Sequence, residues 1–463
     1  MNTEAIRERQ AAAIRALIPE HQQRLAWSRD QVARHQRDQL RSIVGLAQQR
    51  SPWHRARLAG VTPADLELND LPRLPVMTKA DLMRDWDQII TQPGLTLARC
   101  TDFIDGQEDF GYLDPAGHQA FASGGSSGRR GVYVWDEDFF AATATVAFRY
   151  QYRDDLARGV IGRPRLRAVI TAGVPPHAST PLFSARLDPA EQVAVFSVLT
   201  PFDELAGRVG QARPDHLIGY PSVIHRLAEA QAHGQLDIAP SRVSTNSEPL
   251  TAEARAAFES VWGATVTNMW GSTEVGMHAI ACDRSPGLHL AEDVLIVERV
   301  DVGNQPVADS DPAEKLLVTS LIQTTFPFLR YELTDSVTLA AAPCPCGSPQ
   351  RLIADIAGRV DDDFVYPGAG QVPAAAFRHA LSTVPTVEEY QVRQTDRGAA
   401  VTYLGSVADP AALSARIEAE LRSYGLATPE VTLTAADGLP RDPRTGKLRR
   451  FVPARPQDLK HQD

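Results

Sequence analysis

The stretch that decides the fold is Phe121-Ala-Ser-Gly-Gly-Ser-Ser-Gly-Arg-Arg-Gly131. From Ser123 to Gly128 it holds three glycines and three serines, and segments typical of β-strands flank it at 118–122 and 132–135. Glycine lets a main chain approach a ligand closely, so the N–H groups and hydroxyls of this loop can face an anion. The loop is not a Walker A motif, because no Gly-Lys-Ser/Thr follows and the next segment is typical of a strand. Taken alone, the loop also fits a surface hairpin.

Composition limits the class of protein. A chain of 463 residues predicts roughly two to four domains. Its net charge of −10 argues against nucleic-acid and anionic-membrane partners. The charged N-terminus is unlike a signal peptide, and no apolar run approaches the ~18 residues of a membrane span. Four cysteines make no disulfide framework, so we expect a cytoplasmic protein.

Helices and strands alternate along most of the chain. Helical periodicity over residues 1–60 predicts a helical cover. Buried strands are predicted at 166–172, 215–221, 242–247 and 264–270, with a helix at 251–262 between the last two. Strand, helix and strand of this length imply a parallel pair, whose C-terminal loops share the ligand-binding edge of an open α/β sheet. Residues 246–249 and 271–274 should therefore be neighbours.

Three segments carry side chains suited to nucleotide chemistry. Thr273 and Glu274, within Trp270-Gly-Ser-Thr-Glu-Val-Gly276, could offer a hydroxyl to phosphate and a carboxylate to Mg²⁺, or cap a helix. Asp335 ends an aromatic-rich run and could accept two ribose hydroxyls, or be an exposed acid at a strand edge. Lys447, in a basic loop with glycine and proline, is either presented there for function or part of a solvated tail.

The cysteines form a second constellation. Cys282, His289, Cys344 and Cys346 supply three thiols and one imidazole, a complete tetrahedral set for structural Zn²⁺. The alternative is a pair of buried cysteines with a stacked histidine. Cys100 is expected to lie outside the group.

These segments, in this order, resemble the adenylate-forming superfamily of acyl-CoA synthetases and adenylation domains, in its phenylacetate–CoA ligase-like branch. The match spans about residues 50–452. The resembling pieces are Ser123-Gly-Gly-Ser-Ser-Gly128, Tyr220-Pro221, Ser247-Glu-Pro249, Trp270-Gly-Ser-Thr-Glu274, Gly287-Leu-His-Leu-Ala-Glu-Asp293, Leu329-Arg-Tyr331 with Thr334-Asp335, Cys344-Pro-Cys-Gly347, Gly358-Arg-Val-Asp-Asp362, and Pro440-Arg441 with Gly446-Lys447.

The resemblance implies an α/β fold with a large N-terminal domain, in which helices flank β-sheets, and a small mobile C-terminal α+β domain. We place the ATP- and acyl-binding domain at 1–357 and the small domain at 358–463, because 358–363 is a polar turn after which the composition changes. In such enzymes the small domain rotates about a hinge, here Asp361, and brings the loop 365–373 to the acyl-adenylate.

The resemblance also implies a role for each matching residue. The ATP phosphates would be held by Ser123, Gly124, Gly125, Ser126, Ser127 and Gly128, and Thr273 would touch phosphate. Adenine would be flanked by Ser247, Glu248 and Pro249, with Trp270, Gly271 and Ser272 also in the nucleotide site. Asp335 would bind the ribose and Arg359 would support the nucleotide. Glu274 would bind Mg²⁺, and Lys447 would bridge the carboxylate and the nucleotide. The acyl group would be lined by Tyr133, Tyr220, Asn246, Gly276, Met277 and His278.

The implied function is ATP-dependent activation of a carboxylic acid as its acyl-adenylate, with loss of pyrophosphate, and transfer to the thiol of coenzyme A. Aromatic pocket residues favour an aromatic acid. The alternatives are transfer to a carrier-protein thiol or another nucleophile, and a nucleotide-binding homologue without turnover. We expect a monomer or homodimer.

Five positions depart from the family pattern. Arg130 and Gly131 replace Pro-Lys after the loop, Gln371 replaces an asparagine, and Arg378 stands where glutamate is common. Trp270 also replaces a tyrosine. Adenylation is therefore better supported than transfer to coenzyme A.

Overall fold

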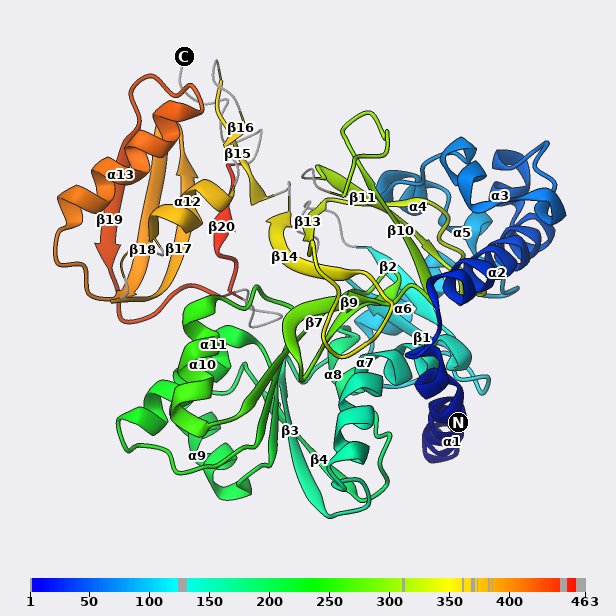
Figure 1. The fold of residues 1–463 in the computed structure, drawn as a ribbon, viewed down its shortest axis with the longest axis horizontal. Coiled ribbons are helices and arrows are strands. Elements are labelled where there is room, and N and C mark those ends of the chain that lie inside the picture. Colours follow the sequence, from blue (N-terminus) through cyan, green and yellow to red (C-terminus); the bar gives the residue numbers. More distant parts are fainter. Residues whose placement is uncertain are drawn as a thin grey trace. The chain divides into compact units, whose positions relative to one another are not determined.

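The computed structural model describes residues 2–123, 131–309, 313–359, 362–367, 371–372, 374–381, 384, 386–441 and 448–454 (Figure 1). The chain forms two compact units. The first comprises Met1–Leu333 and Thr338–Asp355, and the second comprises Thr334–Val337 and Ile356–Asp463. The functional division at 357/358 remains a prediction, because compactness does not tell what each unit binds.

The first unit begins with helices, drawn in blue in Figure 1. They are α1 (Thr3–Arg24), α2 (Arg29–Arg50), α3 (Pro52–Arg57), the 3₁₀ turns η1 (Pro63–Asp65) and η2 (Leu68–Arg73), α4 (Lys79–Arg84), α5 (Trp86–Ile89) and α6 (Leu97–Asp105). The start of α2 is fixed by a capping box between Ser28 and Gln31. Leu40 and Val44 of α2 belong to one apolar core with Leu329.

Strands β3 to β9 of the first unit belong to a nine-stranded sheet. Its order is β13-β14-β9-β8-β7-β6-β5-β3-β4. The strands β4, β3, β5, β6 and β7 run parallel, whereas β7, β8, β9 and β14 pair antiparallel. Their bounds are β3 (Arg165–Thr171), β4 (Glu191–Ser197), β5 (His216–Gly219), β6 (Arg242–Thr245), β7 (Thr265–Ser272), β8 (Gly276–Cys282), β9 (Ser285–Leu290), β13 (Asp335–Leu339) and β14 (Leu352–Arg359).

The helices α8 (Ser179–Phe183), α9 (Phe202–Ala212), α10 (Pro221–Ala232) and α11 (Ala252–Trp262) connect the parallel strands. Figure 1 shows α9, α10 and α11 beside these strands. Apolar side chains such as Leu205, Leu227 and Phe258 share a core with Ile170 and Leu217 of the sheet. The predicted parallel pairing of β6 with β7 is confirmed.

The glycine- and serine-rich loop joins two short antiparallel strands. These are β1 (Gln119–Ala122) and β2 (Val132–Trp135), in which Phe121 lies opposite Tyr133. The helix α7 (Glu137–Ala157) follows and is capped by the side chain of Asp136. A Cβ at Gly276 would lie 2.8 Å from the hydroxyl of Thr143 in α7, so glycine allows this helix to pack against β8.

A three-stranded antiparallel sheet completes the first unit. It is built from β10 (Leu295–Val300), β11 (Lys315–Ser320) and β12 (Tyr331–Leu333). The backbone of Met77 pairs with that of Arg330 and Glu332, so this sheet also holds the segment that precedes α4.

The second unit contains β15 (Phe364–Val365), β16 (Gln371–Val372), α12 (Ala374–Leu381), β17 (Val387–Thr395), β18 (Gly398–Gly405), α13 (Pro410–Ser423), β19 (Glu430–Ala435) and β20 (Phe451–Val452). Its four-stranded sheet has the order β19-β18-β17-β20. Side chains such as Phe377, Ile417 and Phe451 form its core. Among the described residues, no helix is long and apolar enough to cross a membrane.

One boundary differs from the sequence prediction. Gly358 and Arg359, expected in a turn, are the last two residues of β14. The strand begins with the apolar pair Leu352 and Ile353, which pairs with β9, and its extended backbone continues beyond these residues.

Candidate active site

Ser123 stands at the base of the glycine- and serine-rich loop. Its backbone N–H donates to the carbonyl of Gly131, and its hydroxyl accepts from the N–H of Gly131 at 3.2 Å. The ammonium of Lys79 donates to the same hydroxyl, with Nζ and Oγ 3.2 Å apart. The loop residues Gly124, Gly125, Ser126, Ser127 and Gly128 lie outside the described residues.

The predicted metal-binding carboxylate lies beside this loop base. Glu274 occupies the turn between β7 and β8 and is partly exposed. The hydroxyl of Tyr133 donates to Oε1 of Glu274 at 2.7 Å. The loop hairpin and the Thr273–Glu274 turn, which five strands separate in the sequence, are thus brought together by tertiary structure.

Tyr133 is fully buried. Burial, and then the nearby Glu274 carboxylate, raise the pKa of Tyr133 well above its usual range. The phenol therefore stays protonated, and its O–H donates a hydrogen bond to Glu274. The sequence predicted Tyr133 as a wall of the acyl pocket, whereas the structure gives it a polar contact with the predicted metal ligand.

The predicted adenine-flanking segment lies on the neighbouring strand end. Ser247, directly after β6, has a positive φ of 66°, a conformation that costs on the order of 1–3 kcal/mol in a residue other than glycine. Oε2 of Glu248 accepts from the N–H of Ser222 at the start of α10, at 3.3 Å. The N–H of Asn246 donates to the carbonyl of Gly219. The loops after β5 and β6 are therefore joined, as parallel pairing requires.

The predicted acyl-binding residues fall into two groups. His278 stacks on Trp270, a residue predicted for the nucleotide site, with ring centroids 4.5 Å apart, and Met277 is buried. Tyr220 is fully buried in the core under α9, α10 and α11. Gly271 faces Gly276 and Met277 so closely that a Cβ there would lie 2.7 Å from the Gly276 carbonyl oxygen.

Sequence reasoning assigned no function to Lys79, although it identified Thr78 as a helix cap. Thr78 does cap α4, through a capping box with Asp81. Arg330 holds the segment that precedes α4, because its guanidinium donates to the carbonyls of Pro72 and Leu74. The same guanidinium also donates to Glu298. The signal available in the sequence was a lysine at the first position of a capped helix after a proline-rich loop.

The remaining predicted residues belong to the second unit. Asp335 opens β13 and is buried. The backbone of Arg359 ends β14. Asp361 and Lys447 lie outside the described residues, as do residues 368–370 of the predicted transfer loop. Arg441 and Leu448, which precede and follow the Lys447 segment, pair as an antiparallel bridge.

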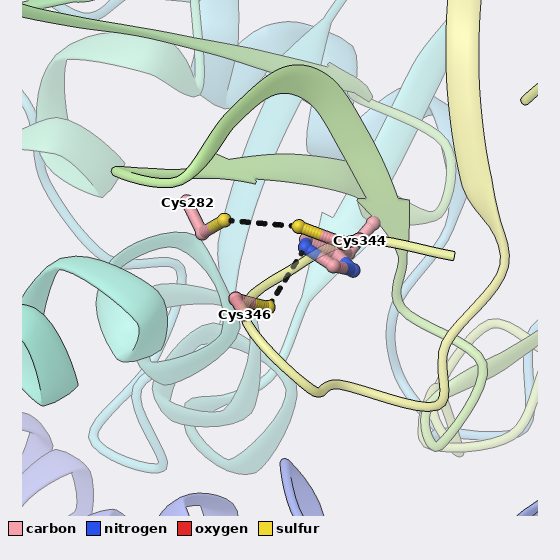
Figure 2. Close-up of side chains that lie close together, drawn as sticks. Cys282, Cys344 and Cys346 are labelled. Carbon is pink, nitrogen blue, oxygen red and sulfur yellow. Dashed lines mark hydrogen bonds between the residues drawn. The ribbon is translucent and has the colours of Figure 1, made fainter. Parts of the chain in front are cut away.

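The predicted zinc ligands do come together (Figure 2). The ligand atoms of Cys282, His289, Cys344 and Cys346 all lie within 4.8 Å of one another. The Sγ atoms of Cys282 and Cys344 are 3.6 Å apart, and Sγ of Cys346 is 3.4 Å from Nε2 of His289. Cys100 is buried in α6, outside this cluster.

This geometry fits a tetrahedral metal. Zn–S bonds of about 2.3 Å and Zn–N bonds of about 2.0–2.1 Å place ligands roughly 3.5–3.8 Å from one another. The neighbouring Cys282 and His289 lower the pKa of Cys346, whereas Cys346 raises the pKa of Cys282 and burial raises that of Cys344. The thiolate is the form that binds a metal. His289 also stacks on Tyr150, with centroids 4.6 Å apart, so the stacked histidine of the alternative interpretation is observed, whereas zinc binding stays a prediction.

The chain has the fold of the adenylate-forming CoA ligases, as its resemblance to that superfamily predicted. It is similar to the crystal structure of 2-hydroxyisobutyryl-CoA ligase in the postadenylation state, with a TM-score of 0.72 and 18% identity. The similarity covers 94% of this chain and 92% of that one. The predicted fold class is thereby confirmed.

Two other similar proteins match a smaller share of this chain. The amide bond synthetase McbA from Marinactinospora thermotolerans has a TM-score of 0.51 and 16% identity, over 70% of this chain and 66% of that chain. Protein CapK of Staphylococcus aureus is 24% identical over 344 residues, which are 72% of this chain and 69% of CapK. No family model matches the chain.

Proposed function

We propose that this protein activates a carboxylic acid with ATP, forming an acyl-adenylate and pyrophosphate, and then transfers the acyl group to a thiol. The observation that carries the proposal is that one hairpin, β1–β2, contacts both Lys79, through Ser123, and Glu274, through Tyr133. These residues supply a hydroxyl at the base of the loop, a cation for phosphate in Lys79, and a partly exposed carboxylate in Glu274.

The chemistry needs these charges. A carboxylate and an α-phosphate repel each other, so adenylation requires cations where negative charge accumulates. Lys79 would bind phosphate oxygen at the loop, and Lys447 would bridge the carboxylate and the nucleotide. Glu274 offers the oxygen ligand that Mg²⁺ prefers. When bound there, Mg²⁺ would neutralise phosphate charge and assist the departure of pyrophosphate.

Coenzyme A is the acceptor that we propose, and an aromatic acid is the substrate class. The stacked rings of Trp270 and His278 support an aromatic acid as substrate, since aromatic walls pack against ring faces. The similarity to a 2-hydroxyisobutyryl-CoA ligase supports coenzyme A as the acceptor.

A structural zinc ion is also part of the proposal. The cluster of Cys282, His289, Cys344 and Cys346 offers four protein ligands, which leaves no open position for a catalytic water. We propose that it stabilises the connection between β8, β9 and the segment before β14.

ATP–pyrophosphate exchange with a panel of aromatic and aliphatic acids tests the function. We expect exchange with at least one aromatic acid, and thioester formation when coenzyme A is added. Binding of ATP without exchange for any acid, at high enzyme concentration, would instead identify a nucleotide-binding protein without turnover. Exchange without transfer to coenzyme A would direct the search to carrier-protein thiols and amines.

A further inference from the structure

Hydrogen bonds attach the hairpin of β1 and β2 to Lys79 and to Glu274. At the end of β1, Lys79 donates to the hydroxyl of Ser123. On β2, the phenol of Tyr133 donates to Oε1 of Glu274 at 2.7 Å. The hairpin therefore contacts a cation through one strand and a carboxylate through the other.

Both ends of this arrangement are fixed by hydrogen bonds. The Ser123 hydroxyl accepts from Lys79 and from the N–H of Gly131. The buried O–H of Tyr133 donates a hydrogen bond to Glu274. Burial makes such a bond harder to replace with water.

The strand that carries Tyr133 has a second attachment to the same turn. The indole N–H of Trp135 donates to the carbonyl of Thr273 at 2.8 Å. Tyr133 and Trp135 are two residues apart on β2 and therefore point to the same face. Two neighbouring side chains of the hairpin thus hold Thr273 and Glu274, one through the backbone and the other through the carboxylate.

Gly131 is part of the same arrangement. A Cβ at this position would lie 2.2 Å from the hydroxyl oxygen of Tyr133. Any larger residue here would displace the phenol from Glu274. Gly131 stands where the family has a lysine. Because it has no side chain, it leaves the room that the Tyr133 hydroxyl needs to reach the Glu274 carboxylate.

We propose that Tyr133 is a positioning residue that fixes the Glu274 carboxylate relative to the phosphate loop, so that Mg²⁺ and the ATP phosphates are bound together. This inference rests on the proposed function. Residues that orient a metal ligand typically contribute 10–100-fold to metal affinity or activity. Tyr133 therefore acts on Mg²⁺-dependent binding rather than as a wall for the acyl group.

The test is Tyr133→Phe, which removes the hydroxyl and keeps the ring. ATP binding is measured by titration calorimetry at several Mg²⁺ concentrations and in EDTA. We expect the Mg²⁺ concentration for half-maximal enhancement of ATP binding to rise about 10-fold, with ATP affinity in EDTA unchanged. The matched control is Tyr112→Phe, which deletes another buried phenol that donates to Gln10 at 2.8 Å, far from this turn in sequence.

A double-mutant cycle with Glu274→Gln completes the test. If Tyr133 acts through Glu274, Tyr133→Phe changes nothing further in the Glu274→Gln background. Unchanged Mg²⁺ dependence in Tyr133→Phe, an equal shift in Tyr112→Phe, or the same shift in both backgrounds overturns the inference. Failure of the wild-type protein to bind ATP with Mg²⁺ would overturn the proposed function itself, which is a different result.

Discussion

The ammonium nitrogen of Lys79 lies 3.2 Å from the hydroxyl oxygen of Ser123, a residue 44 positions later in the chain. The protein has only four lysines among its 47 lysines and arginines. One of the four stands at the base of the glycine- and serine-rich loop, and another, Lys447, is the residue that family resemblance assigns to adenylation. A lysine ammonium is a compact charge that suits contact with phosphate oxygens.

Replacing Lys79 should impair the use of ATP. For Lys79→Met we expect kcat/KM for ATP in pyrophosphate exchange to fall about 10²–10³-fold, because a positioned charge is lost where negative charge develops. Lys315→Met is the control, since Lys315 pairs with Glu332 on the three-stranded sheet. Equal activity of the two variants would exclude a role for Lys79 at the phosphates.

Lys447→Ala should separate the two half-reactions. We expect adenylate formation to be nearly abolished, whereas thiolysis of a supplied acyl-adenylate stays mostly intact, because only the first step needs a cation between carboxylate and phosphate. Both steps are measured on the same preparation. An equal loss in both would mean that the lysine is structural or serves each step.

Asp361→Pro tests the proposed hinge. Proline fixes φ near −65°, so it should hold the second unit in one orientation. We expect adenylation to survive and transfer to the thiol to fall by orders of magnitude, because the two steps need different orientations. Rapid-quench assays of each step provide the measurement. Wild-type rates for both would contradict the rotation.

The cysteine cluster should contain zinc. We expect one equivalent of Zn²⁺ per chain by mass spectrometry of the metal content. Cys344→Ser with Cys346→Ser should lower the melting temperature without changing which acids are activated, because the cluster has no open ligand position. Cys100→Ser, a buried thiol outside the cluster, should keep the metal. Folded, active protein without zinc would refute the assignment.

The buried pair of Arg149 and Asp293 should dominate local stability. Two hydrogen bonds of 2.7 and 2.8 Å join them, and both side chains are fully buried. Although burial alone would raise it, the charge of Arg149 and its hydrogen bonds hold the pKa of Asp293 below its usual range. Such a lowered pKa stabilises the fold above the unfolded pKa of about 4, and this stabilisation is lost as the pH falls.

Denaturant unfolding of Arg149→Met measures this contribution. At pH 7 we expect a loss of about 3–5 kcal/mol, because a buried carboxylate remains without its main partner. The loss should shrink toward pH 3, where Asp293 can take up a proton in the variant. Arg9→Met removes a pair between Glu137 and a half-exposed arginine, and should cost only about 0–1 kcal/mol. Similar losses for both variants would contradict this account.

The sequence alone was sufficient to predict the order of helices and strands and the parallel pairing of β6 with β7. Strand β3 contains a short apolar run at residues 168–170, and helices such as α11 begin at a capping threonine. Such signals are local, within about ten residues. Parallel pairing then follows from connection length, and the pairing of β6 with β7 confirms it, whereas the proximity of residues 246–249 and 271–274 stays a prediction.

The partners of individual side chains were decided by the tertiary structure alone. Nothing near Tyr133 in sequence indicates Glu274, 141 residues away, and nothing near Lys79 indicates Ser123. These contacts depend on how a hairpin, a helix start and a strand turn pack together, and packing has no local signature. The sequence therefore determined which groups the protein has available for its chemistry, and the folded chain determined which of them touch.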